Sequence, residues 1–257
     1  MKASRSHSFL IRMVLCFISI IAAGCVATQP VSESVVSKRA QMHMGTLVTL
    51  TVVATDRRVG DRAMQAGFDE VKRLELLLST WRSDSELSRV NADSGRLPVK
   101  VSQETLDLVA RSLEITQLTQ GGFNIALGPA VEAWSVTEQA HVPDDRELQQ
   151  LRPLVDWTNI RIDKEAGTIF LPLEGMRIDV GGIGKGYAAD RAVEEMKRAG
   201  AMGGVVALSG DIKAFGVLPD QNGFPVGIRH PRQEGALLTM LELKDEAIST
   251  AGDYERF

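Results

Sequence analysis

A glycine-rich stretch at residues 177–190, with the sequence RIDVGGIGKGYAAD, holds the residue types best suited to chemistry. Alternate positions carry glycine: Gly182, Gly184 and Gly186. Because glycine has no side-chain bulk, a ligand phosphate can approach backbone N–H groups and the positive end of a helix there. Lys185 adds a cation, and Asp179 adds a carboxylate that can accept from a sugar, a base or a metal-bound water. We expect a short strand that passes through a glycine turn into the first residues of a helix.

The stretch matches neither of the two common nucleotide-binding motifs. In a Walker A alignment, Asp179 takes the place of the first glycine and Gly186 takes the place of the Ser or Thr hydroxyl. In a Rossmann alignment, the last glycine spacing is one residue short. A tight strand-to-helix turn with incidental glycines therefore stays open as an alternative.

The elements that must position this turn are of both kinds. Alternating Val, Leu and Thr predict a strand at residues 47–54, and apolar residues at helical spacing predict amphipathic helices at 63–79 and 102–118. Further helices are expected at 144–151 and 187–198, a hairpin at 160–162 and 168–171, and strands at 205–208, 226–229 and 237–243. Hairpins mixed with helices favour an α+β fold over a doubly wound parallel sheet.

The N-terminus has the pattern of a secretory signal. Basic residues precede an apolar run at residues 13–23, and the sequence Ala-Ala-Gly at 22–24 leads into Cys25, which resembles a bacterial lipobox. We expect a signal peptide at 1–24, a lipidated Cys25 with a flexible tether at 25–41, and a folded domain at 42–257. A lipid on Cys25 would anchor the protein to a membrane of the bacterial cell envelope, facing the periplasm. A signal peptide with an unrelated cysteine and an uncleaved anchor remain alternatives, although the apolar run is short for a membrane span.

Charge and cysteine content narrow the function classes. Removal of residues 1–24 takes away three of the 29 basic residues and none of the 33 acidic ones, so the formal net charge falls from −4 to −7. An acidic chain without basic runs argues against nucleic-acid binding. Cys16 leaves with the signal, and Cys25 alone cannot form a disulfide within one chain.

The glycine stretch resembles the core motif of the FAD:protein FMN transferases, the ApbE-like flavin transferases. Other segments follow in that family's order, at 44–46 (MGT), 78–91 (LSTWRSDSELSRVN), 121–129 (GGFNIALGP), 209–211 (SGD) and 250–254 (TAGDY), with Trp134 after the third. The resemblance covers residues 42–257 and implies a two-lobed α+β fold of mixed sheet and helices. It also implies transfer of FMN from FAD to a Ser or Thr of a target redox protein, with Mg²⁺ as cofactor and AMP as the second product.

The resemblance assigns roles residue by residue. The FAD site would be lined by Met44, Trp81, Gly122, Phe123 and Asn124, with Asp179 and Lys185 in contact with FAD. The backbone carbonyl of Gly182 would be a metal ligand, which fits the preference of Mg²⁺ for oxygen. Taken alone, Trp81 and Phe123 could instead be core aromatics, and Met44 could fill a gap in the core.

Two features depart from the family pattern. Asn124 stands where the family usually has Asp, so an acceptor oxygen is kept but the negative charge is lost. The family's later His-containing segment and its Asp-Ala-x-x-Thr segment, whose Asp and Thr complete the Mg²⁺ site, have no counterpart up to Phe257. We therefore expect a C-terminally truncated member and assign no catalytic residue. A non-catalytic FAD-binding lipoprotein and an FAD pyrophosphatase are the alternative functions.

Overall fold

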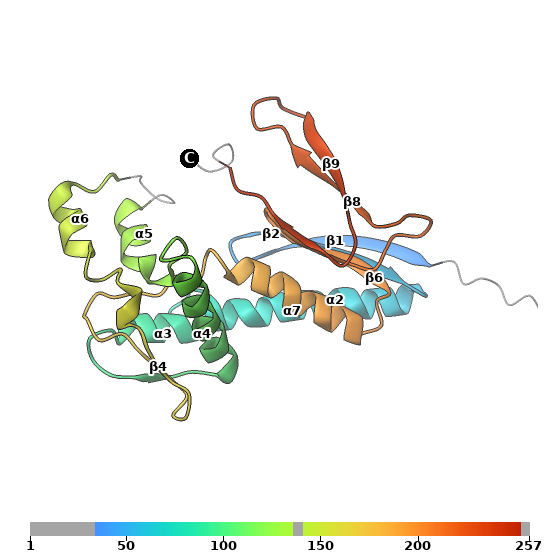
Figure 1. Ribbon diagram of the computed structural model, residues 1–257. Coiled ribbons are helices and arrows are strands. Elements are labelled where there is room, and N and C mark those ends of the chain that lie inside the picture. Colours follow the sequence, from blue (N-terminus) through green and yellow to red (C-terminus); the bar gives the residue numbers. More distant parts are fainter. Residues whose placement is uncertain (1–33, 136–140, 253–257) are drawn as a thin grey trace, which may run out of the picture. The chain divides into compact units, whose positions relative to one another are not determined.

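The computed structural model describes residues 34–135 and 141–252. Two long helices pack against an antiparallel sheet (Figure 1). The strands of this five-stranded sheet follow the order β1-β2-β6-β7-β10. Their bounds are Val35–His43, Thr46–Ala54, Gly203–Leu208, Asp211–Phe215 and Ala247–Ser249. Strand β2 is central to the core because its side chains at alternate positions, Val48, Leu50 and Val52, are fully buried.

The long helices α2 (Arg57–Leu78) and α7 (Gly184–Arg198) pack side by side against the sheet. Asp56 caps α2 by accepting from the N–H of Val59. The buried stripe of α2 has helical spacing and includes Met64, Phe68, Val71, Leu74 and Leu78. The buried residues of α7 are mostly small, among them Ala188, Ala189 and Ala192, and the helix packs closely on α2.

The chain between α2 and α7 forms shorter elements. These are the helices α3 (Glu86–Ala92), α4 (Gln103–Leu118), α5 (Gly128–Trp134) and α6 (Asp145–Leu151), the 3₁₀ turns η1 (Ile125–Leu127) and η2 (Trp157–Asn159), and a sheet of β3 (Val99–Lys100), β5 (Thr168–Phe170) and β4 (Arg161–Asp163). Side-chain caps fix three of the helix starts, at Ser85, Ser102 and Asp144. A separate two-stranded hairpin follows β7, made of β8 (Phe224–Arg229) and β9 (Leu237–Leu243).

Most predicted elements are confirmed. Residues 47–54, 102–118, 144–151 and 237–243 have the predicted secondary structure, and the predicted hairpin is the β4–β5 pair. The mixed α+β class is confirmed as well. Two helices begin earlier than expected, α2 at Arg57 and α7 at Gly184.

Two predictions are wrong. Residues 177–180, expected as a strand, have no regular structure, because their backbone groups are bound by a side chain and a turn instead of a neighbouring strand. The tether predicted for 25–41 does not extend over 35–41, which form most of β1. Strand β1 is an edge strand with mostly exposed side chains, so it lacks the strong apolar alternation that reveals β2.

The predicted signal peptide, Cys25 and the first part of the tether lie outside the described residues. Among the residues that the structure does describe, no helix is both long enough and apolar enough to cross a membrane.

Candidate functional site

The glycine stretch forms the start of α7, and its first turn carries unpaired backbone N–H groups. Ile183 precedes the helix without a side-chain cap, and the N–H groups of Ile183 and Gly184 both donate to the carbonyl of Val180, at 3.0 and 2.7 Å. Within the described part of the chain, the N–H groups of Lys185 and Gly186 have no hydrogen-bond partner. Two unpaired donors at the positive end of a 15-residue helix are suited to an anionic ligand.

Neighbouring groups approach two glycines of this turn closely, Gly181 and Gly182. A Cβ at Gly181 would lie 2.8 Å from Oδ1 of Asp179, and one at Gly182 would lie 3.3 Å from the Phe123 ring. A Cβ at Gly186 would meet nothing within 4 Å, so the space beside Lys185 is open. The turn is therefore crowded on the side of Phe123 and accessible at Gly186.

Asp179 shapes the turn and keeps one oxygen available. Its Oδ1 accepts from the N–H of Gly181 at 2.7 Å, which closes a local turn ahead of the helix. Its other carboxylate oxygen forms no hydrogen bond with the described residues, so it remains an acceptor for a ligand hydroxyl or amine.

Asn91 of α3 fixes the chain immediately before Asp179. Its Oδ1 accepts from the N–H of Ile178 at 2.7 Å, and its Nδ2 donates to the carbonyl of the same residue at 3.0 Å. Asn91 is 4% exposed, so these two bonds replace the strand pairing that residues 177–180 lack. Asn91 ends the motif at 78–91, but the family resemblance gave it no role. Its position on the apolar face of α3, beside Leu87 and Val90, was the signal in the sequence that could have identified it.

The segment at 121–129 contacts the chain at Asp179 and Gly182. The N–H of Asp179 donates to the carbonyl of Ile125 at 2.8 Å. This bond sets Phe123, two residues earlier, beside Gly182. Gly122 is exposed, and its N–H donates to the carbonyl of Thr119 at 3.0 Å.

Asn124 is engaged within the protein by both ends of its amide. Its Oδ1 accepts from the N–H of Ala126 at 2.8 Å and caps the 3₁₀ turn η1, and its Nδ2 donates to the carbonyl of Val155 at 2.9 Å. An ionised Asp could make the first bond but not the second. Asn at this position therefore has a structural reason in this chain.

Met44 comes to the glycine turn from the sheet. It lies in the β1–β2 turn with a φ of +50°, followed by Gly45 at +68°, as expected for a tight hairpin turn that matches the strand twist. The Cε of Met44 would lie 3.9 Å from a Cβ at Gly184. Met44 is thus part of the boundary of the turn.

No hydrogen bond or ring contact among the described residues joins Trp81 to the turn. It follows α2 and is 74% exposed, so it is not a core aromatic. A large exposed ring near the end of α2 is free to stack on a planar ligand.

Two further motif segments meet at the end of the sheet. The N–H of Thr250 donates to the carbonyl of Gly210 at 3.0 Å, and the Ser249 hydroxyl donates to Asp211 at 2.6 Å. Because Leu208 pairs with Val48 at the start of β2, this junction lies at the same end of the sheet as the β1–β2 turn.

Of the two charged residues Asp190 and Lys185, only Asp190 has an ion-pair partner among the described residues. Asp190, further along α7, lies 3.6 Å from Lys213 of β7, whereas Lys185 forms no ion pair with any described residue. The described residues contain no group of three or more His, Cys, Asp or Glu side chains that could hold a metal ion. The carbonyl of Gly182 and the carboxylate of Asp179 are fewer ligands than the octahedral Mg²⁺ site requires.

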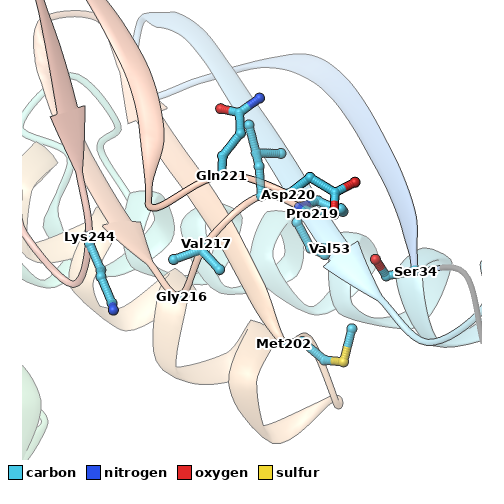
Figure 2. A pocket seen from close by; sticks show the side chains of 10 residues that line it. Ser34, Val53, Met202, Gly216, Val217, Pro219, Asp220, Gln221 and Lys244 are labelled. Atoms are coloured by element: carbon cyan, nitrogen blue, oxygen red, sulfur yellow. The ribbon is translucent and has the colours of Figure 1, made fainter. Parts of the chain in front are cut away.

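A separate cavity of about 390 Å³ lies away from this turn (Figure 2). It is lined by apolar and polar side chains, among them Val53, Met202, Leu218, Asp220 and Lys244. Since Val53 is at the opposite end of β2 from Met44, the cavity does not belong to the glycine turn.

Comparison with known proteins agrees with the motif order. A family model described as the ApbE family matches residues 44–257. The chain is 27% identical to an FAD:protein FMN transferase of Klebsiella pneumoniae (strain 342), over 88% of this chain and 69% of the relative, and 30% identical to one of Treponema pallidum (strain Nichols), over 85% and 65%. It therefore spans about two thirds of the length of these relatives.

Solved structures have the same fold. The ApbE protein from Thermotoga maritima superposes with a TM-score of 0.80 at 26% identity, covering 86% of this chain and 72% of that one. The flavin transferase ApbE from Vibrio cholerae superposes with a TM-score of 0.76 at 25% identity, covering 86% and 73%. The predicted fold class is thereby confirmed at the level of the whole matched domain.

Proposed function

This chain belongs to the ApbE family, and from that premise we propose that it binds FAD and transfers FMN from FAD to a Ser or Thr hydroxyl of a target redox protein, with release of AMP. The names of its relatives support the reaction. The observation that carries the proposal for this chain is the first turn of α7, where unpaired N–H groups lie beside Lys185.

The turn suits the pyrophosphate of FAD. Its N–H groups and the Lys185 ammonium would receive the phosphate oxygens, since charge-assisted hydrogen bonds are the strongest kind available there. The open space at Gly186 would admit the phosphates. The transfer forms a bond between the acceptor oxygen and the FMN phosphorus and breaks the bridging P–O bond, so that AMP leaves and the hydroxyl proton is released to solvent.

The remaining predicted residues would hold the two ends of FAD. Phe123, fixed beside Gly182, and the exposed Trp81 offer rings that stack on flavin or adenine. Asp179 has an unused carboxylate oxygen for a ribose hydroxyl or an adenine amine. Met44 would pack against the cofactor from the sheet side. Because the amide of Asn124 is engaged at both ends, we propose that it supports the loop instead of binding FAD.

Mg²⁺ does not fit the described residues alone, since they supply no cluster of acidic ligands. The same observation favours a second candidate function, in which the chain binds FAD without turnover.

One assay separates these functions. The purified chain is incubated with FAD, Mg²⁺ and an acceptor domain that carries a flavinylation site, and a denaturing gel is examined for covalent flavin fluorescence. A fluorescent acceptor band supports the transferase. FMN and AMP without a labelled acceptor indicate a pyrophosphatase, and bound FAD without products indicates a binding protein. A Lys185→Met variant is the matched control, and a chain that binds no FAD would contradict all three.

We also propose that Cys25 carries a lipid that holds the domain at a membrane of the bacterial cell envelope. The support is the sequence pattern before Cys25. Labelling of cells with a radioactive fatty acid should mark the unaltered chain and not a Cys25→Ala variant. Equal labelling of both would contradict the assignment.

A further inference from the structure

The first turn of α7 has little intrinsic stability. It contains Gly184 and Gly186, and glycine is the poorest helix former after proline. Ile183 provides no side-chain cap for the exposed N–H groups. The turn that the proposed function needs must therefore be held by contacts from elsewhere.

Tyr187, the fourth residue of α7, provides such a contact. Its hydroxyl donates to Oε1 of Glu104 in the first turn of α4, at 2.9 Å. Tyr187 comes two residues after Lys185, so this bond ties the glycine turn to a second helix.

Glu104 is itself held by Arg73 of α2. Two nitrogens of the Arg73 guanidinium donate to the two oxygens of Glu104, at 2.6 and 3.0 Å. The same guanidinium donates to both oxygens of Glu70, at 2.8 and 2.7 Å, and Glu70 is 7% exposed. Because Arg73 is fixed by a buried carboxylate, Glu104 is a rigid acceptor.

Arg191, one turn after Tyr187, strengthens the same junction. Its Nε lies 3.7 Å from both Glu70 Oε1 and Glu104 Oε1, and it pairs with Glu194 on its own helix. This Nε is buried without a hydrogen-bond partner in the described structure, so its interaction with the two carboxylates is by charge alone.

The protonation states suit the bond. Burial and the hydrogen bond to Glu104 raise the pKa of Tyr187 to about 12, so its hydroxyl keeps the proton that it donates. The hydrogen bond from Arg73 is the main reason that the pKa of Glu104 is lowered, so Glu104 is a carboxylate at neutral pH.

We infer that Tyr187 and Glu104 are positioning residues, which hold the first turn of α7 so that Lys185 and its neighbouring N–H groups are correctly placed for FAD. The inference rests on the proposed function. It separates two roles of the helix, since Lys185 would touch the cofactor and Tyr187 would act only through the turn.

The test compares Tyr187→Phe and Glu104→Gln with Glu114→Gln. Glu114 lies on the same helix as Glu104, but it is 60% exposed and pairs only with Arg111 in the described structure, so its substitution controls for the loss of a carboxylate. Three quantities are measured on the full chain: FAD affinity by flavin fluorescence, the melting temperature, and amide hydrogen exchange along α7.

In Tyr187→Phe, we expect exchange at residues 187–189 to accelerate and FAD affinity to fall, each by about three- to tenfold, while the last two turns of α7 are unchanged. Glu104→Gln should act in the same direction, and Glu114→Gln should match the unaltered chain. A merely structural role would lower the melting temperature and speed exchange evenly along α7 without changing FAD affinity, and that result would overturn the inference. Exchange and affinity within about twofold of the unaltered chain would also overturn it.

The two proposals fail in distinguishable ways. If the unaltered chain binds no FAD, the proposed function is wrong. Exchange at residues 187–189 then still decides whether Tyr187 holds the turn, because that measurement needs no ligand. If Glu104→Gln does not fold, Tyr187→Phe alone decides, since it removes one hydroxyl and keeps the ring.

Discussion

Replacing Asn124 with Asp restores the residue that the family resemblance leads one to expect and should destabilise this chain. The first hydrogen bond, from the N–H of Ala126, survives because an Asp oxygen can accept it. The second does not, because a carboxylate oxygen would face the carbonyl of Val155 at about the present 2.9 Å, acceptor against acceptor. Loss of that bond with an unpaired acceptor left behind costs about 1–2 kcal/mol at pH 7.

The penalty should depend on pH with a defined sign. When the introduced carboxyl is protonated it can donate to the carbonyl of Val155, so the folded state raises the pKa of this carboxyl above its unfolded value. A cost of about 1.4 kcal/mol corresponds to a rise of about one pKa unit, from about 4 to about 5. Stability of the variant relative to the unaltered chain is therefore highest below about pH 4, falls as the pH rises through about 5, and is constant above that.

Urea unfolding followed by tryptophan fluorescence at pH 4 and pH 7 measures both effects. Asn222→Asp is the matched control, since Asn222 is exposed and its side chain makes no hydrogen bond in the described structure. If Asn124→Asp is as stable as the unaltered chain at pH 7, the bond to Val155 is not what holds this amide. If FAD affinity rises while stability is unchanged, Asn124 faces the cofactor instead.

Three other substitutions test the site. Lys185→Met should weaken FAD binding by about 10- to 100-fold, measured by fluorescence titration, and change the free energy of unfolding by no more than about 0.5 kcal/mol, because Lys185 has no ion pair in the described structure. Asn91→Ala should cost about 2–4 kcal/mol in urea unfolding, since it leaves both backbone groups of Ile178 unpaired, and a loss below about 1 kcal/mol would contradict the clamp. In Glu104→Gln, the free energy of unfolding should fall less steeply as the pH is lowered. The pKa of Glu104 is lowered in the folded state, so its ionised form contributes stability that is present above the unfolded pKa and lost as the pH falls through the folded pKa. An unchanged pH dependence, measured by unfolding between pH 3 and 6, would show that the contribution of Glu104 is negligible.

Elements with one buried face could be predicted from the sequence. Strand β2 alternates buried and partly exposed residues, and α2 has a buried stripe, so periodicity alone finds both. The predicted ranges 102–118 and 144–151 begin at Ser102 and Asp144, and each of these residues caps its helix through its own side chain. These are local patterns, and their physical causes lie within a few residues.

Elements that depend on distant partners could not be predicted in this way. Strand β1 is paired on one side and mostly exposed, so its sequence carries little alternation. Residues 177–180 have strand-like composition, but Asn91 binds both backbone groups of Ile178 from 87 residues away. The start of α7 at Gly184 contradicts glycine's low helix propensity, and we attribute it to the packing of α7 on α2 and to the Tyr187–Glu104 bond with α4.

The candidate site, too, could be predicted from the sequence only in part. The order of motifs identified which segments belong to it, and the structure brings Met44, Phe123, Asp179 and Lys185 to one glycine turn. Among the described residues, Trp81 is 74% exposed and has no hydrogen bond or ring contact with that turn. The roles of Asn91 and Tyr187 could not be predicted from the sequence, because both residues act through groups that are remote in sequence.

The Asn91 clamp also limits when the glycine turn can fold. Asn91 leaves the ribosome 87 residues ahead of Ile178, a delay of roughly 4–17 s at a translation rate of about 5–20 residues per second. Until Ile178 is available, the amide of Asn91 lacks both of its backbone partners, and β2 likewise lacks β6 on its second side. The glycine turn is therefore completed only once α2, α3, α4 and Ile178 are all available to fold.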